Sequence, residues 1–555
     1  MNASPDSNTR IKIALNTLGP VMGFAAAVAF LNVLMNFSYP SGGNQISRLL
    51  LMSPEIFVVL IALGLAAFSS LPSHAVLFLP LTLAVIFLRL FRFADSFVPA
   101  YFFRPFNLYL DSQFVPDLLF LLYSTLPLKV FCLWSLLAVL TIGLTAWGIT
   151  RALKIIYAFI SGLRRVRALT ATAALLGFMI YSPQPWTGGR AEFIFAPGIF
   201  QRVAAEFDFI LHLSDRIHKH QAAFDAVIQK GRSYQRPLTK LNGSDVYVFF
   251  IESYGHTVFA DHRHSRLITP FLQDSEHNLK KHGYSVCSNF LKSPAYGGSS
   301  WLAHGALSSG VSIDSQLQYD LLLTSPVPTV AEYFNRASYR TVSVMPGTLW
   351  PWSAGKFYKY RKKYYAPDFD YQGPKFGWAP MTDQYVLDTI YRAEIQNRTQ
   401  PLFIEFVLIS SHAPFNELPR YVPDWSAIGD GSIYHRQKPL KFPTTWPGLE
   451  NASEAYVASI KYDFQVLVGF LEQMVTGDEM IIIMGDHQPN LKITGENQPW
   501  SVPVHVISRN PNFVRPFIKR GYTPGLIPSQ ALPHAGIESV FWNLLEEFSD
   551  TAFQK

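Results

Sequence analysis

The sequence predicts two regions of different fold class: an N-terminal α-helical transmembrane domain of about five spans and a C-terminal α/β domain with a mainly parallel central sheet. Long charge-free apolar stretches occur only in the first third of the chain. Further on, short apolar runs alternate with helical patterns, and three of these runs end in polar side chains. Only 15% of the 555 residues are charged, which is low for a soluble protein and favours a membrane region.

Four stretches without Asp, Glu, Lys or Arg predict the membrane spans: 13–47, 56–88, 130–150 and 168–189. A helix needs about 20 mostly apolar residues to cross a bilayer. We therefore expect spans at 13–37, in each half of 56–88 with a turn at 69–74, at 130–150, and at 168–182. A cleaved signal peptide would explain one such stretch but not four. The apolar segment 118–128 is too short to span alone, and it either extends the fourth helix or lies at the interface.

The distribution of basic residues predicts the orientation. Residues 151–167 contain five Lys and Arg and no acid, so we expect this segment on the cytoplasmic side, as a basic amphipathic helix. The loop at 92–117 then lies outside. After five spans the rest of the chain is extracytoplasmic. We expect a transmembrane domain at 1–184, a helical connector at 185–240 and a catalytic domain at 241–550.

The C-terminal pattern predicts an α/β domain. Strands alternate with helices, which is typical of a mainly parallel sheet whose chemistry lies at the carboxyl ends of the strands. One helix is expected to begin with Thr269 as its cap and Pro270 at its first position. The expected strands are 245–253, 284–291, 339–345, 401–410 and 479–487, and the expected helices are 268–283, 380–397 and 453–475.

Three of the expected strands end in residues that can bind a metal. Glu252 ends the first, His412 follows the fourth, and Asp486 and His487 end the last. An acid at a strand end is often only a loop cap, but an adjacent Asp-His pair after an apolar strand is less ordinary. Carboxylate and imidazole ligands together suit a divalent metal such as Mn²⁺ or Zn²⁺.

A serine pair precedes an apolar helix in SPAYGGSSWLAHGALSSG, residues 293–310. Ser299 or Ser300 could simply cap this helix. Alternatively, one of them is a nucleophile, because a metal lowers the pKa of a hydroxyl and a helix N-terminus favours the resulting anion. In that case Glu252, Ser300, Asp486 and His487 would form one tetrahedral-type metal site.

The motifs IESYG, GGSSWLAHGALSSG, SSHAPF and GDHQP occur in the order found in the alkaline phosphatase superfamily. The chain most closely resembles the sulfatase-like membrane branch of that superfamily, the lipoteichoic acid synthases and phosphoglycerol transferases. The resemblance implies a sulfatase-like (alkaline phosphatase-like) α/β domain after five spans. It also implies a multi-pass protein of the bacterial inner (cytoplasmic) membrane with its catalytic domain periplasmic or extracellular.

The resemblance also suggests roles for individual residues. Sulfatases place their nucleophile ten residues before the last glycine of C-x-P-S-R-A-A-L-L-T-G, which corresponds here to Ser300 before Gly310. The G-K-T-S context of lipoteichoic acid synthases favours Ser299 instead. His304 falls where sulfatases have an Arg that supports the nucleophile, although it could equally be a packed helical histidine. His412 resembles the substrate-binding His that could donate a proton to the leaving group.

The implied activity is transfer of a phospholipid headgroup, for which phosphoglycerol is the leading candidate. The headgroup would pass through a covalent Ser300 intermediate to a cell-envelope glycan or lipid-linked acceptor. Mn²⁺ is the expected metal, with Zn²⁺ or Mg²⁺ as alternatives, and no nucleic-acid partner is expected. Serine in place of the sulfatase cysteine favours a phosphate diester over a sulfate ester. A sulfatase-like hydrolase, a phosphoethanolamine transferase and a non-catalytic binding module remain as alternatives. Phosphoethanolamine transferases usually contain several disulfides here, whereas this domain has only Cys287.

The basic, aromatic-rich segment 355–369 could be a phosphate-facing loop or a solvated surface. Because it aligns loosely with a substrate-contacting region of the family, Trp352 and Arg361 are weaker site candidates. Five further histidines have no assigned role: His256, His262, His264, His505 and His534.

Overall fold

The computed structural model forms two compact units, Met1–Ala100 with Arg104–Leu213, and Tyr101–Phe103 with Ser214–Lys555. Each unit is described separately. The described residues are 7–37, 49–68, 74–102, 104–162, 164–181, 194–350, 352–444, 452–495, 497–529, 531 and 533–550.

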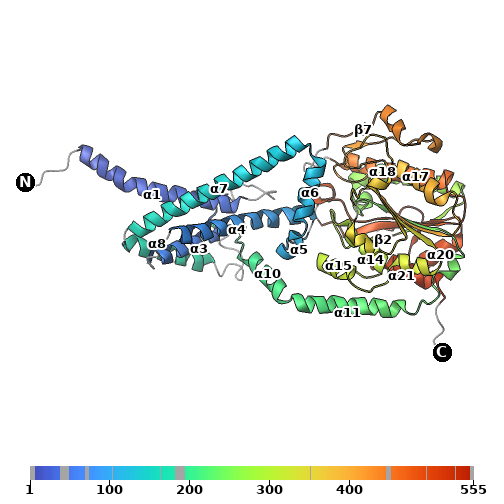
Figure 1. The fold of residues 1–555 in the computed structure, drawn as a ribbon, viewed down its shortest axis with the longest axis horizontal. Helices are drawn as coiled ribbons and strands as arrows, with labels where there is room; N and C mark the ends of the chain where they lie inside the picture. Colours follow the sequence, from blue (N-terminus) through green and yellow to red (C-terminus); the bar gives the residue numbers. More distant parts are fainter. Residues whose placement is uncertain are drawn as a thin grey trace, which may run out of the picture. The chain divides into compact units, whose positions relative to one another are not determined.

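The first unit is mainly helical, with one isolated β-bridge between Met52 and Phe195 (Figure 1). Helix α3 packs against α7 and α8, and α1 packs against α7, with Leu63, Leu153 and Ile160 fully buried among them. The helices are α1 (Ser7–Asn36), α3 (Pro54–Phe68), α4 (His74–Phe102), α5 (Leu108–Ser112), α6 (Val115–Thr125), α7 (Leu128–Gly162), α8 (Arg164–Tyr181) and α10 (Phe200–Leu211).

Three helical segments of this unit are long and apolar enough to cross a membrane: Leu18–Asn36, Leu77–Tyr101 and Leu128–Gly162. Two shorter apolar helices, Pro54–Phe68 and Val166–Met179, correspond to the second and fifth expected spans. The predicted helical membrane region is therefore confirmed, with a span count between three and five. All but one residue of the expected turn at 69–74 lies outside the described residues.

Two predictions about connections between spans were wrong. The expected loop at 92–117 begins as helix, because α4 continues to Phe102 and its charged residues are paired. Arg92 lies 3.3 Å from Glu55, and Asp95 lies 2.7 Å from Arg202. The basic segment 151–167 is not a separate helix either. Its first part continues α7 and its last part begins α8.

The second unit contains an eight-stranded sheet in the order β10-β2-β9-β8-β1-β5-β3-β4. Strands β8, β1, β5, β3 and β4 are parallel, and β9, β2 and β10 are joined through antiparallel pairs. This confirms the mainly parallel sheet. The strands are β1 (Val246–Ile251), β2 (Ser285–Lys292), β3 (Arg340–Met345), β4 (Lys362–Tyr365), β5 (Leu402–Leu408), β8 (Met480–Gly485), β9 (Ser501–Ser508) and β10 (Thr523–Pro524).

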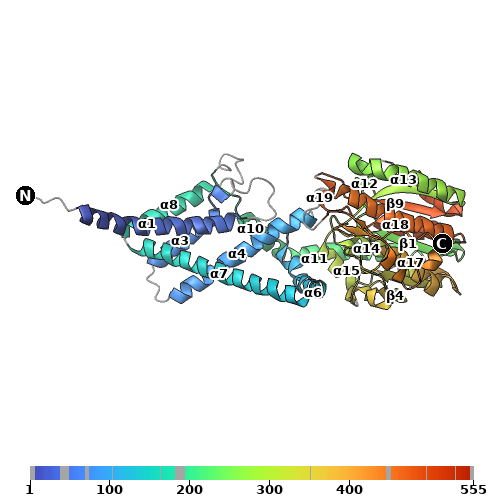
Figure 2. The ribbon, with the colours of Figure 1, turned by 90° about the horizontal axis from the view of Figure 1, so that it is seen from above.

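Helices cover both faces of this sheet (Figures 1 and 2). Successive residues of β1 point to opposite faces. Phe249 belongs to a core cluster that includes residues of α13, α17 and α18. Phe250 belongs to a second cluster that includes residues of α14, α16, α20 and α21. The layer helices are α13 (His262–Lys281), α14 (Ser300–Ser309), α16 (Val330–Arg336), α17 (Asp383–Ile390), α18 (Ser453–Gln473), α20 (Pro511–Lys519) and α21 (Glu538–Phe548).

The remaining helices are α11 (Leu213–Gly231) in the connector region, α12 (Thr257–Ala260), α15 (Gln316–Leu323) and α19 (Leu491–Thr494). A two-stranded sheet pairs β6 (Glu417–Leu418) with β7 (Leu440–Lys441). Short helical turns are η1 (Thr239–Leu241), η2 (Ser353–Lys356), η3 (Ala366–Asp368), η4 (Tyr391–Ile395), η5 (Trp425–Ala427) and η6 (Ser432–Arg436).

The predicted start of one helix was wrong. Helix α13 begins at His262, where the Asp261 side chain accepts the backbone N–H of Arg263. Pro270 therefore lies inside the helix rather than at its first position. In Figure 2, α13 and α18 lie side by side over the sheet, and their packing favours the longer helix.

Candidate active site

The parallel pairing of β1 and β8 determines where the candidate site lies. Ile251 pairs with Gly485, so the residues that follow, Glu252 and Asp486, leave the sheet next to each other. A Cβ at Gly485 would lie 1.8 Å from the carbonyl oxygen of Tyr254, so only glycine fits this close approach. Glu252, Asp486 and His487 are all buried.

The three side chains converge on one point. The Nε2 atom of His487 lies 3.2 Å from Glu252 Oε1 and 3.6 Å from Asp486 Oδ2. Ligand atoms of the three residues all lie within 4.8 Å of one another. His487 Nδ1 lies 2.7 Å from the carbonyl oxygen of Gln488. That contact holds a proton on Nδ1 and directs Nε2 toward the carboxylates, the arrangement typical of a metal-ligating histidine.

Asp486 has one satisfied oxygen and one unsatisfied oxygen. Its Oδ1 accepts the backbone N–H groups of Ser253 at 2.8 Å and His487 at 2.7 Å. Its Oδ2 is buried and has no hydrogen-bond partner. Leaving a buried carboxylate oxygen unpaired is costly, and a cation at this point would remove that cost. Two carboxylates, one imidazole and a hydroxyl are also a donor set that suits a divalent metal.

The electrostatics of the cluster show that protons occupy it when no metal is bound. Burial and the neighbouring Glu252 raise the pKa of Asp486 to about 7. Burial disfavours the charged form of His487, but Asp486 and Glu252 outweigh it and raise its pKa to about 9. Burial also opposes ionisation of Glu252, yet the charge on His487 brings the pKa of Glu252 below its ordinary value. A metal must therefore displace protons from this site.

Ser300 joins these three residues. It is the first residue of α14, and its Oγ lies 3.3 Å from Glu252 Oε2 and 3.2 Å from His487 Nε2. The structure thus brings together all four residues that the sequence proposed as metal ligands. Among the described residues, Ser300 and not Ser299 makes these contacts.

Neither serine acts as a conventional helix cap. Ser299 occupies the N-cap position, but its backbone is left-handed, with a φ of 64°, and its side chain makes no capping hydrogen bond. Gly297 and Gly298 also have positive φ values, 68° and 148°. These three residues turn the chain sharply and present Ser300 at the start of α14.

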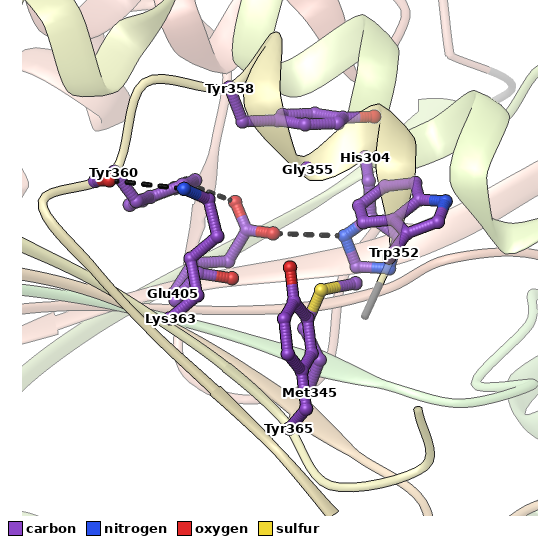
Figure 3. Close-up of a pocket in the computed structure, with 10 residues that line it drawn as sticks. His304, Met345, Trp352, Gly355, Tyr358, Tyr360, Lys363, Tyr365 and Glu405 are labelled. Carbon is purple, nitrogen blue, oxygen red and sulfur yellow. Dashed lines mark hydrogen bonds and ion pairs between the residues drawn. The ribbon is translucent and has the colours of Figure 1, made fainter. Parts of the chain in front are cut away.

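His304 lies one helical turn after Ser300 and forms a buried pair with Glu405 of β5. Its Nδ1 lies 3.1 Å from Glu405 Oε1, and the hydroxyl of Tyr360 donates to Glu405 Oε2 at 2.8 Å. Figure 3 shows His304 and Tyr360 approaching this carboxylate from two directions. They line a cavity of about 10 Å³, room for about one water molecule, together with Trp352 and Lys363.

His412 is oriented by two contacts. Its ring stacks on Trp378, with centroids 3.9 Å apart and planes 16° apart. Its Nδ1 lies 2.7 Å from the carbonyl oxygen of Ala413, which leaves Nε2 as the free ring atom. The charge of His412 is among those that lower the pKa of Glu252, after that of His487. His412 is therefore electrostatically coupled to the Glu252 cluster.

The sequence did not identify Glu405 or Trp378 as part of this region. The available signal for Glu405 was a single acid inside the apolar run PLFIEFVLIS. Trp378 lies in GWAPMTDQ, residues 377–384, which resembles a family helix start that supports the site but suggests no chemistry for the tryptophan. Arg361 is exposed, and its backbone N–H donates to Thr341. His256, His264 and His505 are buried and bonded to Ser501, Ser453 and Ser288, respectively, whereas His262 and His534 are exposed.

The part of the chain that contains this site resembles a known protein family. Residues 249–513 match the model of the sulfatase family. This region is a sulfatase-family domain. The matched region contains the four candidate ligands Glu252, Ser300, Asp486 and His487, and it supports the expected resemblance to sulfatases. No curated protein matches the chain.

Several solved structures resemble the chain at low sequence identity. Lipoteichoic acid synthase LtaP from Listeria monocytogenes is 13% identical, with 48% of this chain and 65% of LtaP covered and a TM-score of 0.34. This chain thus spans less than two thirds of LtaP. Streptococcus pyogenes phosphoglycerol transferase GacH is 12% identical, with coverages of 60% and 91% and a TM-score of 0.35. Lipooligosaccharide phosphoethanolamine transferase A (EptA) from Neisseria meningitidis is 12% identical, with coverages of 94% and 95% and a TM-score of 0.46.

Proposed function

We propose that this chain is a membrane-anchored, metal-dependent phosphotransferase that moves a phospholipid headgroup. Phosphoglycerol is the first candidate, and the acceptor is a hydroxyl of a cell-envelope glycan or a lipid-linked molecule. One observation carries the proposal: Ser300 Oγ lies 3.3 Å from Glu252 Oε2 and 3.2 Å from His487 Nε2, in a sulfatase-family domain. The unpartnered Asp486 Oδ2 belongs to the same cluster.

Glu252, Ser300, Asp486 and His487 would hold the metal, which we propose to be Mn²⁺, with Zn²⁺ or Mg²⁺ as alternatives. When bound, a divalent metal lowers the pKa of a serine hydroxyl and offsets the negative charge of a phosphate. The buried position of the cluster strengthens this effect, because charges interact more strongly away from water.

The first step is attack by the Ser300 alkoxide on the headgroup phosphorus. A bond forms between Ser300 Oγ and phosphorus, and the bond from phosphorus to the diacylglycerol oxygen breaks. His412 donates the proton on Nε2 to that leaving oxygen. Because Ser299 does not cap α14, the first backbone N–H groups of that helix can bind phosphate oxygens.

The second step regenerates the residues. An acceptor hydroxyl attacks the same phosphorus and gives its proton to His412 Nε2. The bond between phosphorus and Ser300 Oγ breaks, which restores the alkoxide. His304 has a supporting role in this proposal: paired with Glu405, it secures α14 one turn behind the nucleophile.

The proposal also specifies where the protein lies in the cell and how its chain is divided into domains. We place it in a bacterial inner membrane with the catalytic domain periplasmic or extracellular, so that the donor lies in the adjacent leaflet. The proposed division is a transmembrane domain at 1–184, a connector at 185–240 and a catalytic domain at 241–550. The helical segments of spanning length support the membrane anchor.

The site chemistry alone supports phosphoethanolamine equally well as the donor, because it acts on the phosphate that both headgroups share. Water as acceptor would make the protein a hydrolase. The free, buried Cys287 favours phosphoglycerol, since the resembling phosphoethanolamine transferases usually contain several disulfides.

The test supplies full-length protein with headgroup-labelled phosphatidylglycerol or phosphatidylethanolamine and with Mn²⁺, Zn²⁺ or Mg²⁺. We expect diacylglycerol release and label on the protein, both lost in Ser300→Ala and retained in the matched control Ser299→Ala. The lipid that labels the protein identifies the donor, and label that passes only to water indicates a hydrolase. Undiminished release by the Ser300→Ala protein would refute the proposal.

A further inference from the structure

A second pair of acids, Asp383 and Asp463, is completely buried near the loop that carries His412, and the mechanism above does not use it. Asp383 is the first residue of α17, and Asp463 lies in the middle of α18. Both side chains are 0% exposed. Buried carboxyl groups away from a charged partner are costly, so this pair requires an explanation.

Asp383 fixes the backbone immediately before His412. Its Oδ1 accepts the N–H of Ile409 at 2.9 Å, and its Oδ2 accepts the N–H of Ser410 at 2.8 Å. The next residue, Ser411, donates its hydroxyl to the carbonyl oxygen of Glu252 at 2.7 Å. One carboxylate thereby holds a loop that contacts the main chain of Glu252 and continues into His412.

Asp463 differs from Asp383 in its surroundings. Neither of its oxygens makes a hydrogen bond of normal geometry. Apart from burial, the charge of Asp383 and then the hydroxyl of Ser411 affect its ionisation most. Burial and then the charge of Asp383 raise its pKa well above the ordinary value. Two neighbouring carboxyl groups cannot both ionise easily in a buried site, so one of them keeps a proton. Burial raises the pKa of Asp383 too, but the backbone N–H groups of Ile409 and Ser410 oppose that increase, so Asp383 is the charged member.

We propose that Asp463 carries the single proton of this pair and that the pair is a positioning device. The protonated Asp463 stabilises the position of Asp383, and Asp383 fixes the backbone of residues 409–411. That segment in turn orients Glu252 and His412. The inference rests on the proposed function of Glu252 and His412, and neither Asp383 nor Asp463 touches substrate.

The same isosteric substitution at each residue tests the proposal. In Asp463→Asn, a neutral side chain with a donor replaces a neutral carboxylic acid, so kcat and metal affinity should stay within about twofold of the wild type. In Asp383→Asn, the amide cannot accept both backbone N–H groups as an anion does. We expect kcat and metal affinity to fall about 10- to 100-fold, the usual effect of removing a group that orients metal ligands.

The measurements are calorimetric titration of the full-length protein with Mn²⁺ or Zn²⁺, Tm, and kcat and KM with labelled phosphatidylglycerol and phosphatidylethanolamine. A lower Tm in Asp383→Asn with metal affinity and kcat unchanged would show a purely structural role and overturn the proposal. Equal effects of the two substitutions, or a larger effect of Asp463→Asn, would overturn it as well.

Ser411→Ala keeps the proposal testable if Asp383→Asn does not fold. Removing the hydroxyl that holds the Glu252 carbonyl should weaken metal affinity about tenfold. Unchanged affinity would overturn the proposal. The calorimetric arm needs no lipid. A wild-type protein that binds metal but transfers neither headgroup would therefore contradict the proposed function. The metal affinities of the variants would still show whether Asp383 and Asp463 position the metal ligands.

Discussion

At each end of the central sheet, strands β1 and β8 place two buried carboxylates next to one another. Glu252 and Asp486 follow the strands at the carboxyl end, and Asp245 and Glu479 precede them at the amino end. The amino end contains a guanidinium: Arg398 lies 2.6 Å from Asp245 and 3.8 Å from Glu479. The carboxyl end contains an imidazole, His487, within 3.6 Å of both acids.

The identity of the basic partner separates the two ends. A guanidinium remains charged at all ordinary pH values and cannot ligate a metal, so Arg398 makes the amino end an ion-paired cluster, although Glu479 Oε2 has no hydrogen-bond partner there. An imidazole can release its proton and become a ligand. Two similar pairs of acids on the same strands are thereby suited to different tasks, one to stabilising the fold and the other to binding a cation.

The difference between the two ends of the sheet is tested most directly by replacing one aspartate with asparagine at each end. Asp486→Asn should reduce metal affinity more than about 100-fold, since it removes a ligand rather than a group that orients one. Asp245→Asn should leave metal affinity unchanged and lower the free energy of unfolding by about 1.5–3 kcal/mol, because an amide pairs less well with Arg398 than a carboxylate does. Calorimetric metal titration and urea unfolding measure the two effects, and loss of metal binding in Asp245→Asn would contradict the division.

The next largest effect concerns His412, which lies near the carboxyl end of the sheet. His412→Gln removes the proposed proton donor and should lower kcat about 100-fold or more, within the range typical of general acids. Metal affinity should stay within about threefold, because His412 is not a proposed ligand. Steady-state turnover and metal titration on the same preparation separate the two roles, and a parallel loss of both would place His412 among the ligands instead.

A smaller effect, counted per pH unit, is expected from pH between about 7 and 9. Both Asp486 and His487 have raised pKa values, about 7 and about 9, so each favours the metal-free fold at low pH and this stability is lost as pH rises through those values. Metal binding must displace the same protons, so affinity should increase about tenfold per pH unit between pH 7 and 9 and more steeply below 7. The Tm increase caused by added metal should therefore grow from pH 6 to 9, and a constant increase would be contrary to this reading.

The smallest effect should come from Trp378. Its stacking on His412 is worth about 0.5–1.5 kcal/mol, so Trp378→Ala should lower kcat about 2- to 10-fold. Trp378→Phe keeps an aromatic face and should recover most of the loss. If kcat is the same in all three proteins, the stack does not orient His412.

The parts of the site that sequence alone could predict follow apolar strands. Strands β1 and β8 are uninterrupted apolar runs, so the acids after them were recognisable without coordinates. Strand β9 was missed because Pro503 and His505 interrupt its pattern, and β4 because KKYY reads as part of a basic surface. Which serine faces the cluster depends on backbone angles at 297–299, and the sequence left that choice open.

Contacts between residues far apart in the sequence could not be predicted, because they form only when the helices pack together. Asp463 is a single acid within an apolar helix, and nothing in the chain connects it to Asp383 before α17 and α18 pack together. In the first unit, Arg92 and Asp95 suggested the end of a span. Their partners Glu55 and Arg202 come from other segments, so only the fold reveals that the helix continues.

The left-handed backbone at Ser299 limits which residues could ever occupy that position. With a φ of 64°, it tolerates glycine, asparagine or a small polar residue, whereas a β-branched side chain would be strained. Ser300 begins the helix and has no such limit, so threonine could replace it and retain a hydroxyl. Across divergent sequences, position 300 could therefore hold either serine or threonine. Position 299 would be limited to a few residue types that accept a left-handed backbone.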